Sequence, residues 1–137
     1  MRYILDANMA IGALNGVETV RQALSEVPAA EVGLPILALA ELYFGAYKSR
    51  RRDENLAKVR ALAQTLTVLP VTGDVVDLYG HTRATLERRG LVKTDFDLII
   101  ACTALALKAT LVTNDRSLLD GSISELQTAN WLIEAGR

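Results

Sequence analysis

The sequence is poor in the residues that hold small secreted or metal-stabilised domains together. Its 137 residues include one cysteine, one histidine and three prolines. One cysteine cannot form an internal disulfide, and one cysteine with one histidine cannot complete a structural zinc site. A chain of this length buries about two-thirds of its unfolded surface, so an apolar core suffices to stabilise it. Few prolines and 23% charged residues argue against disorder.

Long hydrophobic runs are also missing. The longest strongly apolar run, from Leu98 to Leu107, is far shorter than the ~20 residues of a membrane-spanning helix. Asp6 lies where a signal peptide would have its apolar segment. The sequence therefore predicts a cytoplasmic protein without a membrane partner, built as a single domain over residues 1–137.

Short apolar segments alternate with segments of helical period. The expected strands are 2–5, 31–34, 67–69, 111–113 and 126–128, and the expected helices are 8–14, 17–27, 36–49, 53–64, 73–89, 95–108 and 116–119. This alternation predicts an α/β fold: a three-layer sandwich whose central sheet of about five short strands is mostly parallel, with helices on both faces.

Acidic residues follow two of the expected strands. Asp6 comes directly after Tyr3-Ile4-Leu5, and Asn114-Asp115 come after Leu111-Val112-Thr113. Open parallel sheets bind their ligands beyond the carboxyl ends of the strands, so both acids are expected where such a fold has its chemistry. Each acid also suits a simpler role, because a carboxylate before a helix caps its free N–H groups. Asp97 likewise fits a capping box that begins at Thr94.

Glu41 is harder to explain structurally. It is the only charged residue in the segment from Ile36 to Gly45, and the nearest basic residue, Lys48, is seven positions away. A lone carboxylate in apolar surroundings must shift its pKa or find a cation. A metal ion or a distant arginine would satisfy it. Several carboxylates with no nearby thiolate or imidazole favour Mg²⁺ or Mn²⁺, which serve phosphoryl chemistry.

Four motifs in order resemble PIN-domain ribonucleases, and their spacing and the chain length resemble the VapC-type toxins of bacterial toxin–antitoxin pairs. The motifs are Ile4-Leu5-Asp6-Ala7-Asn8, Ala40-Glu41-Leu42 with Gly45, Phe96-Asp97-Leu98-Ile99-Ile100-Ala101, and Leu111-Val112-Thr113-Asn114-Asp115, with the late Trp131. The resemblance covers nearly the whole chain. It implies a PIN-like sandwich, a Mg²⁺- or Mn²⁺-dependent endoribonuclease activity, a homodimer, and inhibition by a cognate VapB-type antitoxin.

The resemblance also implies the site. Its expected catalytic acids are Asp6, Glu41, Asp97 and Asp115, with Asp6, Asp97 and Asp115 as metal ligands and Asn8, Thr113, Asn114 and Asp95 in support. The usual Asp-Thr-Asn is here Asp6-Ala7-Asn8, which removes a hydroxyl from the site. Asp95 is two residues from Asp97 and competes for the third metal role; Asp97 is preferred because it directly precedes Leu98-Ile99-Ile100-Ala101.

Basic and aromatic residues mark the expected partner surfaces. Two basic runs, Lys48 with Arg50, Arg51 and Arg52, and Arg83 with Arg88, Arg89 and Lys93, are either solvated helix ends or contacts to the RNA backbone; the first run supplies the RNA-binding candidates. Tyr43, Phe44 and Tyr47 are candidates for an antitoxin groove, although aromatics at helical spacing more often belong to the core.

Other functions fit less well. A phospho-receiver domain needs an acidic pair after the first strand and an aspartate ending the third, and this chain has Asp6-Ala7-Asn8 and Pro70-Val71-Thr72 there. Cys102 and His81 show no spacing that pairs them as a nucleophile and its base. A catalytically inactive PIN-like RNA-binding or signalling module stays open as the alternative.

Overall fold

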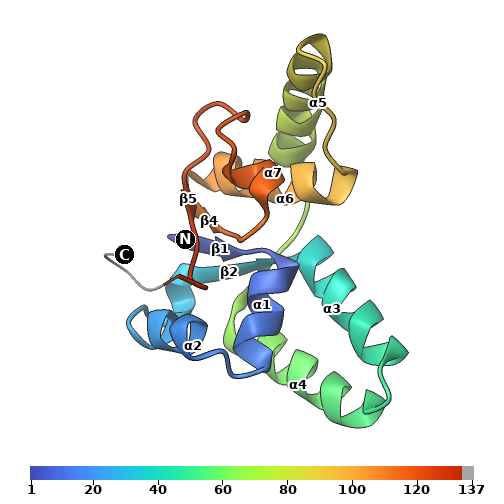
Figure 1. The fold of residues 1–137 in the computed structure, drawn as a ribbon, viewed down its shortest axis with the longest axis vertical. Helices are drawn as coiled ribbons and strands as arrows, with labels where there is room; N and C mark the ends of the chain where they lie inside the picture. Colours follow the sequence, from blue (N-terminus) through green and yellow to red (C-terminus); the bar gives the residue numbers. More distant parts are fainter. Residues whose placement is uncertain (134–137) are drawn as a thin grey trace.

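The computed structural model describes residues 1–133 and confirms the expected α/β architecture (Figure 1). The strands are β1 (Tyr3–Leu5), β2 (Val32–Pro35), β3 (Thr67–Leu69), β4 (Thr110–Val112) and β5 (Thr128–Ala129). The α-helices are α1 (Ala7–Leu14), α2 (Glu18–Ser25), α3 (Ile36–Lys48), α4 (Arg52–Thr65), α5 (Gly73–Arg88), α6 (Asp95–Leu107) and α7 (Arg116–Leu119), with a 3₁₀ turn at Ala29–Glu31.

The five strands form one parallel sheet in the order β3-β2-β1-β4-β5. β1 is central and pairs on one side with β2, with Tyr3 opposite Val32, and on the other with β4, with Ile4 opposite Leu111. The strand order therefore reverses at β1, since the chain runs outward to β2 and β3 and later to β4 and β5. Such a switch point leaves a crevice at the carboxyl ends of the two strands that flank it.

Helices cover the sheet on both sides: α5, α6 and α7 lie on one side and α1 to α4 on the other (Figure 1). The side chains of the central strands form an apolar core that is closed to solvent; Ile4, Leu5, Leu34, Leu111 and Val112 are fully buried. Trp131 closes one end of this core by packing edge-on against Tyr3, with ring centroids 5.1 Å apart.

Helix starts follow from the capping residues that the sequence supplies. The Thr72 and Thr94 hydroxyls accept the N–H groups of Val75 and Asp97 at the starts of α5 and α6. Gly90, at φ +72°, follows α5, where the left-handed backbone suits glycine. The capping box expected at Thr94 is therefore present on its threonine side.

Four of the five strands differ from expectation by one or two residues. β1 begins at Tyr3 rather than at residue 2, and β2 covers residues 32–35 rather than 31–34. The last strand is Thr128–Ala129 rather than 126–128, because the Leu126 N–H bonds to the Ile123 carbonyl in a turn before sheet pairing begins. β4 covers residues 110–112 rather than 111–113; Thr113 continues the backbone pairing through its N–H to the Ala129 carbonyl, but its side chain is engaged in the crevice. No helix within residues 1–133 is long and apolar enough to cross a bilayer.

Candidate active site

Asp6 lies at the carboxyl edge of the sheet, where β1 ends and α1 begins. Its side chain is held by two hydrogen bonds: Oδ1 accepts the Met9 N–H at 2.9 Å and Oδ2 accepts the Thr113 hydroxyl at 2.5 Å. The residue is 6% exposed. Burial raises the pKa of Asp6, the two hydrogen bonds oppose this rise, and the charges of Asp97 and Asp115 add to it. Asp6 is therefore both a helix cap and a member of an acidic cluster.

Thr113 connects the two strand ends. Its hydroxyl donates to Asp6 and accepts the Asp115 N–H at 3.0 Å, and the residue is fully buried. One side chain thus fixes the carboxylate that follows β1 and the backbone of the acid that follows β4. This contact spans 107 positions in the sequence, so it depends on the pairing of β1 with β4.

Asp97 and Asp115 face each other from the starts of α6 and α7. Asp115 caps α7, with its Oδ1 accepting the Ser117 N–H at 2.9 Å. Burial raises the pKa of Asp97; the hydrogen bond with Thr94 lowers it, the charge of Asp115 and a hydrogen bond shared with Asp115 raise it, and Lys93 lowers it. The two acids are close enough that Asp115 favours the protonated form of Asp97.

Glu41 projects from α3, half-buried, and forms no hydrogen bond or ion pair within the part of the chain that the structure describes. Burial raises its pKa, and the charges of Asp97 and Asp6 raise it further. The sequence predicted a carboxylate without a nearby base, and the structure adds that the charges acting on it are those of Asp97 and Asp6. An arginine does not satisfy it, since every ion pair within residues 1–133 involves other carboxylates.

The four acids therefore form a cluster of negative charge, which we call the acidic cluster (Asp6, Glu41, Asp97 and Asp115), and none of them pairs with a cation among residues 1–133. They come from the ends of β1 and β4 and from α3 and α6. Across residues 1–133, no group of three or more Asp, Glu, His or Cys side chains is arranged so that it could hold a metal ion. The cluster is thus an open, all-oxygen donor set rather than a closed ligand cage.

Comparison with known proteins agrees with this geometry. Residues 3–121 match the family model described as the PIN domain. The chain belongs to the PIN-domain family. It is 32% identical over 117 residues to "Ribonuclease VapC2" of Rickettsia felis, a match that covers 84% of this chain and 87% of that protein.

A further relative and a solved structure agree. The chain is 27% identical to the "tRNA(fMet)-specific endonuclease VapC" of Shigella flexneri, with 96% of this chain and 98% of that protein covered. Its fold matches the crystal structure of VapBC2 from Rickettsia felis bound to a promoter DNA fragment, with TM-score 0.86, 30% identity, and coverage of 96% and 99%. The chain is thus a ribonuclease of the VapC type, as its motifs predicted.

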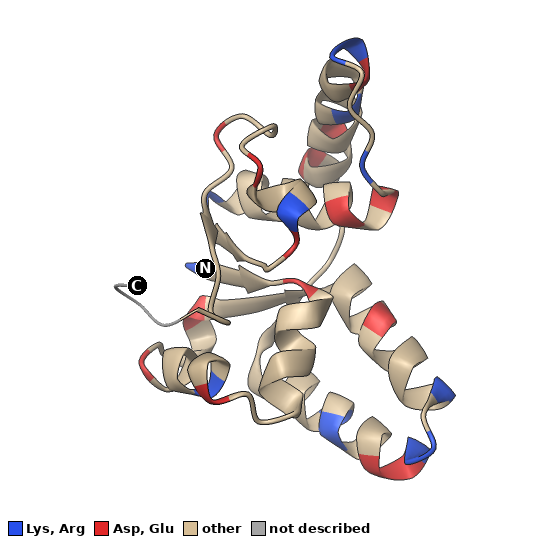
Figure 2. Cartoon of the chain, viewed as in Figure 1, with Lys and Arg blue, Asp and Glu red and all other residues tan. Residues whose placement is uncertain are grey.

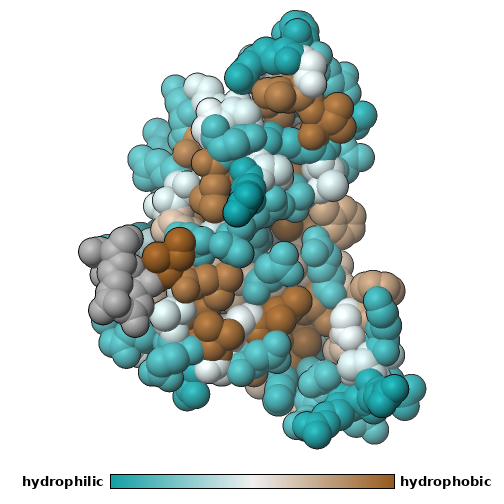
Figure 3. Space-filling view, in the orientation of Figure 1, coloured by the Kyte–Doolittle hydropathy of each residue, from teal (hydrophilic) through white to brown (hydrophobic). Residues whose placement is uncertain are grey.

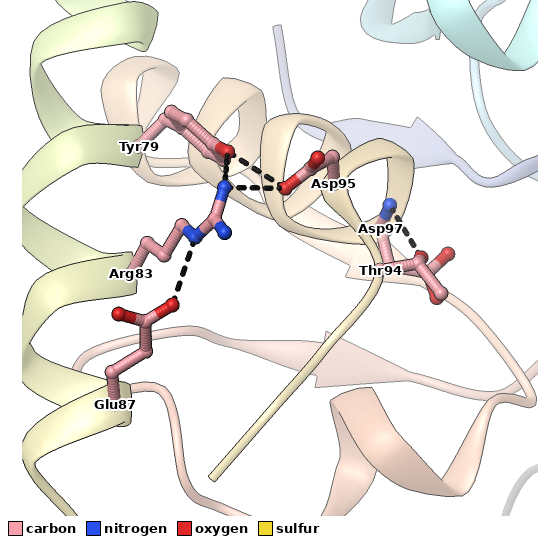
Figure 4. Close-up of polar contacts among 6 residues, drawn as sticks. All are labelled: Tyr79, Arg83, Glu87, Thr94, Asp95 and Asp97. Carbon is pink, nitrogen blue, oxygen red and sulfur yellow. Dashed lines mark hydrogen bonds and ion pairs between the residues drawn. The ribbon is translucent and has the colours of Figure 1, made fainter.

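Asp95, the other aspartate at the start of α6, points away from the acidic cluster. Asp95 lies toward α5, where its Oδ1 accepts the Tyr79 hydroxyl at 2.7 Å and pairs with Arg83 Nη1 at 3.2 Å (Figure 4). Arg83 also bonds Glu87, and Asp97 lies with Thr94 on the other side of the turn. The structure therefore brings Asp97, and not Asp95, to the acidic cluster.

The predicted supporting residues divide in the same way. Thr113 contacts the acidic cluster through Asp6, whereas Asn8 is exposed in the first turn of α1. Asn114 is exposed, and its Oδ1 accepts the Asn130 amide at 2.7 Å. Sequence reasoning missed Asn130, whose hydrogen bond to Asn114 helps to fix the segment between Thr113 and Asp115. The available signal was its position: it directly follows the last strand, at the carboxyl edge that holds the other polar residues.

Basic residues gather at the turn between α3 and α4 and along α5 (Figure 2). Arg50, Arg51 and Arg52 line a surface hollow of about 490 Å³ at that turn. Arg51 pairs with Glu54 at 3.9 Å and Arg52 with Asp53 at 3.4 Å. Lys48 is seven residues from Glu41 on the same helix, or about 10 Å along its axis.

Two of the three aromatic residues on α3 contradict the core interpretation. Phe44 and Tyr47 are 67% and 58% exposed, and only Tyr43 packs against the core. Lys48 lies over the Phe44 ring, with Nζ 5.5 Å from its centroid. Figure 1 shows that α3 extends away from the sheet, with α4 beside its far end.

A groove runs between α1, α3 and α4, and we call it the three-helix groove. Its volume is about 210 Å³, and its lining comprises Ile11, Leu14, Asn15, Glu41, Leu42, Gly45, Ala46, Asn55, Lys58 and Val59. Figure 3 shows hydrophobic side chains exposed over α1 on this side of the molecule. Glu41 belongs to both the groove and the acidic cluster, so the two features are continuous.

Proposed function

We propose that this VapC-type ribonuclease hydrolyses RNA phosphodiester bonds at the acidic cluster, with Mg²⁺ or Mn²⁺ as cofactor. The observation that supports this most directly is that four carboxylates approach one another while none of them forms an ion pair within residues 1–133. Such an arrangement costs free energy unless protons or a metal ion neutralise it. An all-oxygen donor set favours Mg²⁺ or Mn²⁺ over zinc or copper.

Asp6, Asp97 and Asp115 would hold the ion, after rotation of side chains toward one another. When bound, the ion would neutralise the phosphate oxygens and lower the pKa of an attacking water. Asp6 is the fixed member, because both of its oxygens already accept hydrogen bonds from protein groups. Asp97 and Asp115 lie on helix starts facing it and would close the set.

Glu41 has a different role in this proposal. It accepts no hydrogen bond from residues 1–133, and its raised pKa reflects burial and its acidic neighbours. A carboxylate that is free of structural partners can orient a water and take a proton from it. Glu41 therefore orients the attacking water, while the aspartates bind the ion.

Single-stranded or looped RNA is the substrate class, since its phosphates and bases are accessible. The hollow lined by Arg50, Arg51 and Arg52, with Lys48 beside it, would contact the backbone beyond the cleaved bond. Such contacts make binding sensitive to salt. A transcript of initiator tRNA is the first defined substrate to test, because a relative carries that specificity in its name.

The decisive experiment compares two neighbouring aspartates. Purified protein is incubated with Mn²⁺ and either total cellular RNA or the initiator tRNA transcript, and the products are mapped by their ends. Asp97→Asn should abolish cleavage, while Asp95→Asn, the same chemical change two positions away, should retain it because Asp95 contacts Tyr79 and Arg83. Equal loss in both variants would contradict the assignment. Metal binding without cleavage of either RNA would favour the inactive RNA-binding module.

A VapB-type antitoxin is the proposed protein partner, in line with the VapBC complexes that this fold matches. An apolar segment of the antitoxin would fill the three-helix groove and end beside Glu41, which would block substrate from the acidic cluster. Leu14→Asp should weaken the complex without changing cleavage by the free toxin, and Leu119→Asp, at an exposed position away from the groove, is the matched control. Calorimetry measures the affinity of each variant for the antitoxin.

A homodimer is the proposed assembly. Val76, Val92 and Phe96, on α5, the loop after it and the start of α6, are 51%, 89% and 44% exposed. Apolar side chains gathered at one end of a domain favour burial against a partner. Val76→Asp should therefore shift the protein toward the monomer in sedimentation experiments. An unchanged sedimentation coefficient would contradict a dimer through this end.

A further inference from the structure

Lys93 is a buried cation beside the acidic cluster. Its side chain is 4% exposed, although lysine is almost never buried without a partner. The ammonium donates to the Ser117 carbonyl and pairs with Asp120 Oδ2 at 3.2 Å. Sequence analysis placed Lys93 in a basic run at the surface, and its burial corrects that interpretation.

These contacts join the two elements that carry Asp97 and Asp115. Lys93 immediately precedes Thr94, whose hydroxyl accepts the Asp97 N–H at the start of α6. On the other side, Ser117 donates its N–H to Asp115 at 2.9 Å and offers its carbonyl to Lys93. One ammonium thus connects the first residues of α6 to the only turn of α7.

We propose that Lys93 is a positioning residue that holds α7 against the start of α6 and thereby sets the separation of Asp97 and Asp115. The inference rests on the proposed function in one respect, namely that these two acids bind the metal ion. Lys93 itself contacts neither ion nor substrate. Groups that orient metal ligands in this way commonly contribute a factor of about 10–100 to metal affinity.

The sign of one effect separates positioning from simple charge. At a pH where the carboxylates are fully ionised, a buried ammonium repels a divalent cation, so if Lys93 acted only through its charge, its removal would tighten Mn²⁺ binding. If Lys93 positions the acids, its removal would weaken Mn²⁺ binding despite the lost repulsion. α7 is suited to such control, because it is a four-residue helix with little packing of its own beyond the buried Leu118.

The test measures Mn²⁺ affinity by electron paramagnetic resonance of the free ion, in protein shown to be folded by circular dichroism. Lys93→Met keeps the aliphatic stem and removes the ammonium; we expect Mn²⁺ affinity to fall about tenfold. Lys108→Met, at an exposed lysine at the far end of α6 from Asp97, is the matched control and should bind as the unmodified chain does. Unchanged or tighter binding by Lys93→Met would overturn the proposal.

A second variant covers the case in which Lys93→Met fails to fold. Asp120 uses Oδ1 for the Ser122 N–H and hydroxyl and Oδ2 for Lys93. Asp120→Asn therefore keeps the Oδ1 contacts with Ser122 but places an amide NH₂ beside the ammonium in place of the carboxylate oxygen. It should weaken Mn²⁺ binding several-fold and speed amide exchange at Leu118 and Leu119, which bond to the Asp115 carbonyl. Normal exchange and affinity would refute the positioning role.

These readouts also separate the two proposals. Failure of the unmodified chain to bind Mn²⁺ would refute the proposed cofactor. The amide exchange of α7 needs no metal, so it still decides whether Lys93 holds this helix. Normal Mn²⁺ binding in the unmodified chain, with no change in either variant, would refute the role of Lys93 alone.

Discussion

Replacing Thr113 with valine should destabilise the protein more than any cavity would explain. Valine has nearly the same shape as threonine, so the fully buried site stays filled. The hydroxyl is lost, and with it the 2.5 Å bond to Asp6 and the 3.0 Å acceptor for the Asp115 N–H. The perturbation is therefore purely polar and lies at the base of the acidic cluster.

The expected magnitude follows from these two bonds. A hydrogen bond to a charged group contributes about 1.5–3 kcal/mol, and a neutral one about 0.5–1.5 kcal/mol. Thr113→Val should therefore lower the free energy of unfolding by about 2–4 kcal/mol at pH 7. Thr113→Ser keeps the hydroxyl and loses a methyl group, for which about 1 kcal/mol is expected. The valine variant should also raise the pKa of Asp6, because the Thr113 hydrogen bond lowers it.

Urea unfolding of the metal-free protein, followed by circular dichroism, measures the free energies. The same pair of substitutions in an Asp6→Asn background isolates the interaction, since the charged acceptor is then absent and the valine penalty should shrink. A valine variant at least as stable as the serine variant would refute the reasoning. So would a valine penalty that is unchanged when Asp6 is neutral.

Three further predictions concern the cluster and the core. Glu41→Gln should abolish cleavage, and full activity in this variant would exclude the proposed role. The metal-free variant should be at least as stable as the unmodified protein, because the raised pKa of Glu41 shows that its charge is unfavourable in the folded state. The pKa values of Asp6, Glu41 and Asp97 are higher in the folded protein than in the unfolded chain, so the free energy of unfolding of the metal-free protein should fall as pH rises above about 4. Denaturation measurements in saturating Mn²⁺ should show a weaker pH dependence. Trp131→Leu should cost about 1–2 kcal/mol through lost contact with Tyr3, measured by thermal unfolding.

Much of the fold was predictable because the local signals agree with the tertiary structure. Thr94 and Thr72 mark helix starts, and buried segments such as Ile4-Leu5 mark strands. The least accurate element was the last strand, which is two residues long and has weak periodicity. Its pairing is decided by contacts of β5 with β4, which lie outside any local sequence window.

The site was predictable as a set of acids but not as an arrangement. Capping and catalysis were treated as alternatives for Asp6, yet the structure shows that capping uses one carboxylate oxygen and leaves the other for Thr113. The separation of Asp95 from Asp97 depends on Tyr79 and Arg83 of α5, and the burial of Lys93 depends on α7. Contacts between distant helices decide all of these, and sequence spacing does not contain them.

The same contacts explain how a stable fold tolerates an unfavourable cluster. Asp6 and Asp115 are held by backbone N–H groups and by Thr113, so their geometry is fixed even while their charges repel those of Glu41 and Asp97. Hydrogen bonds to carboxylates stabilise the folded chain, whereas repulsion among them opposes ionisation. A divalent cation would remove the repulsion and leave the hydrogen bonds intact, so metal binding should stabilise the protein most at the pH values where the free carboxylates are ionised.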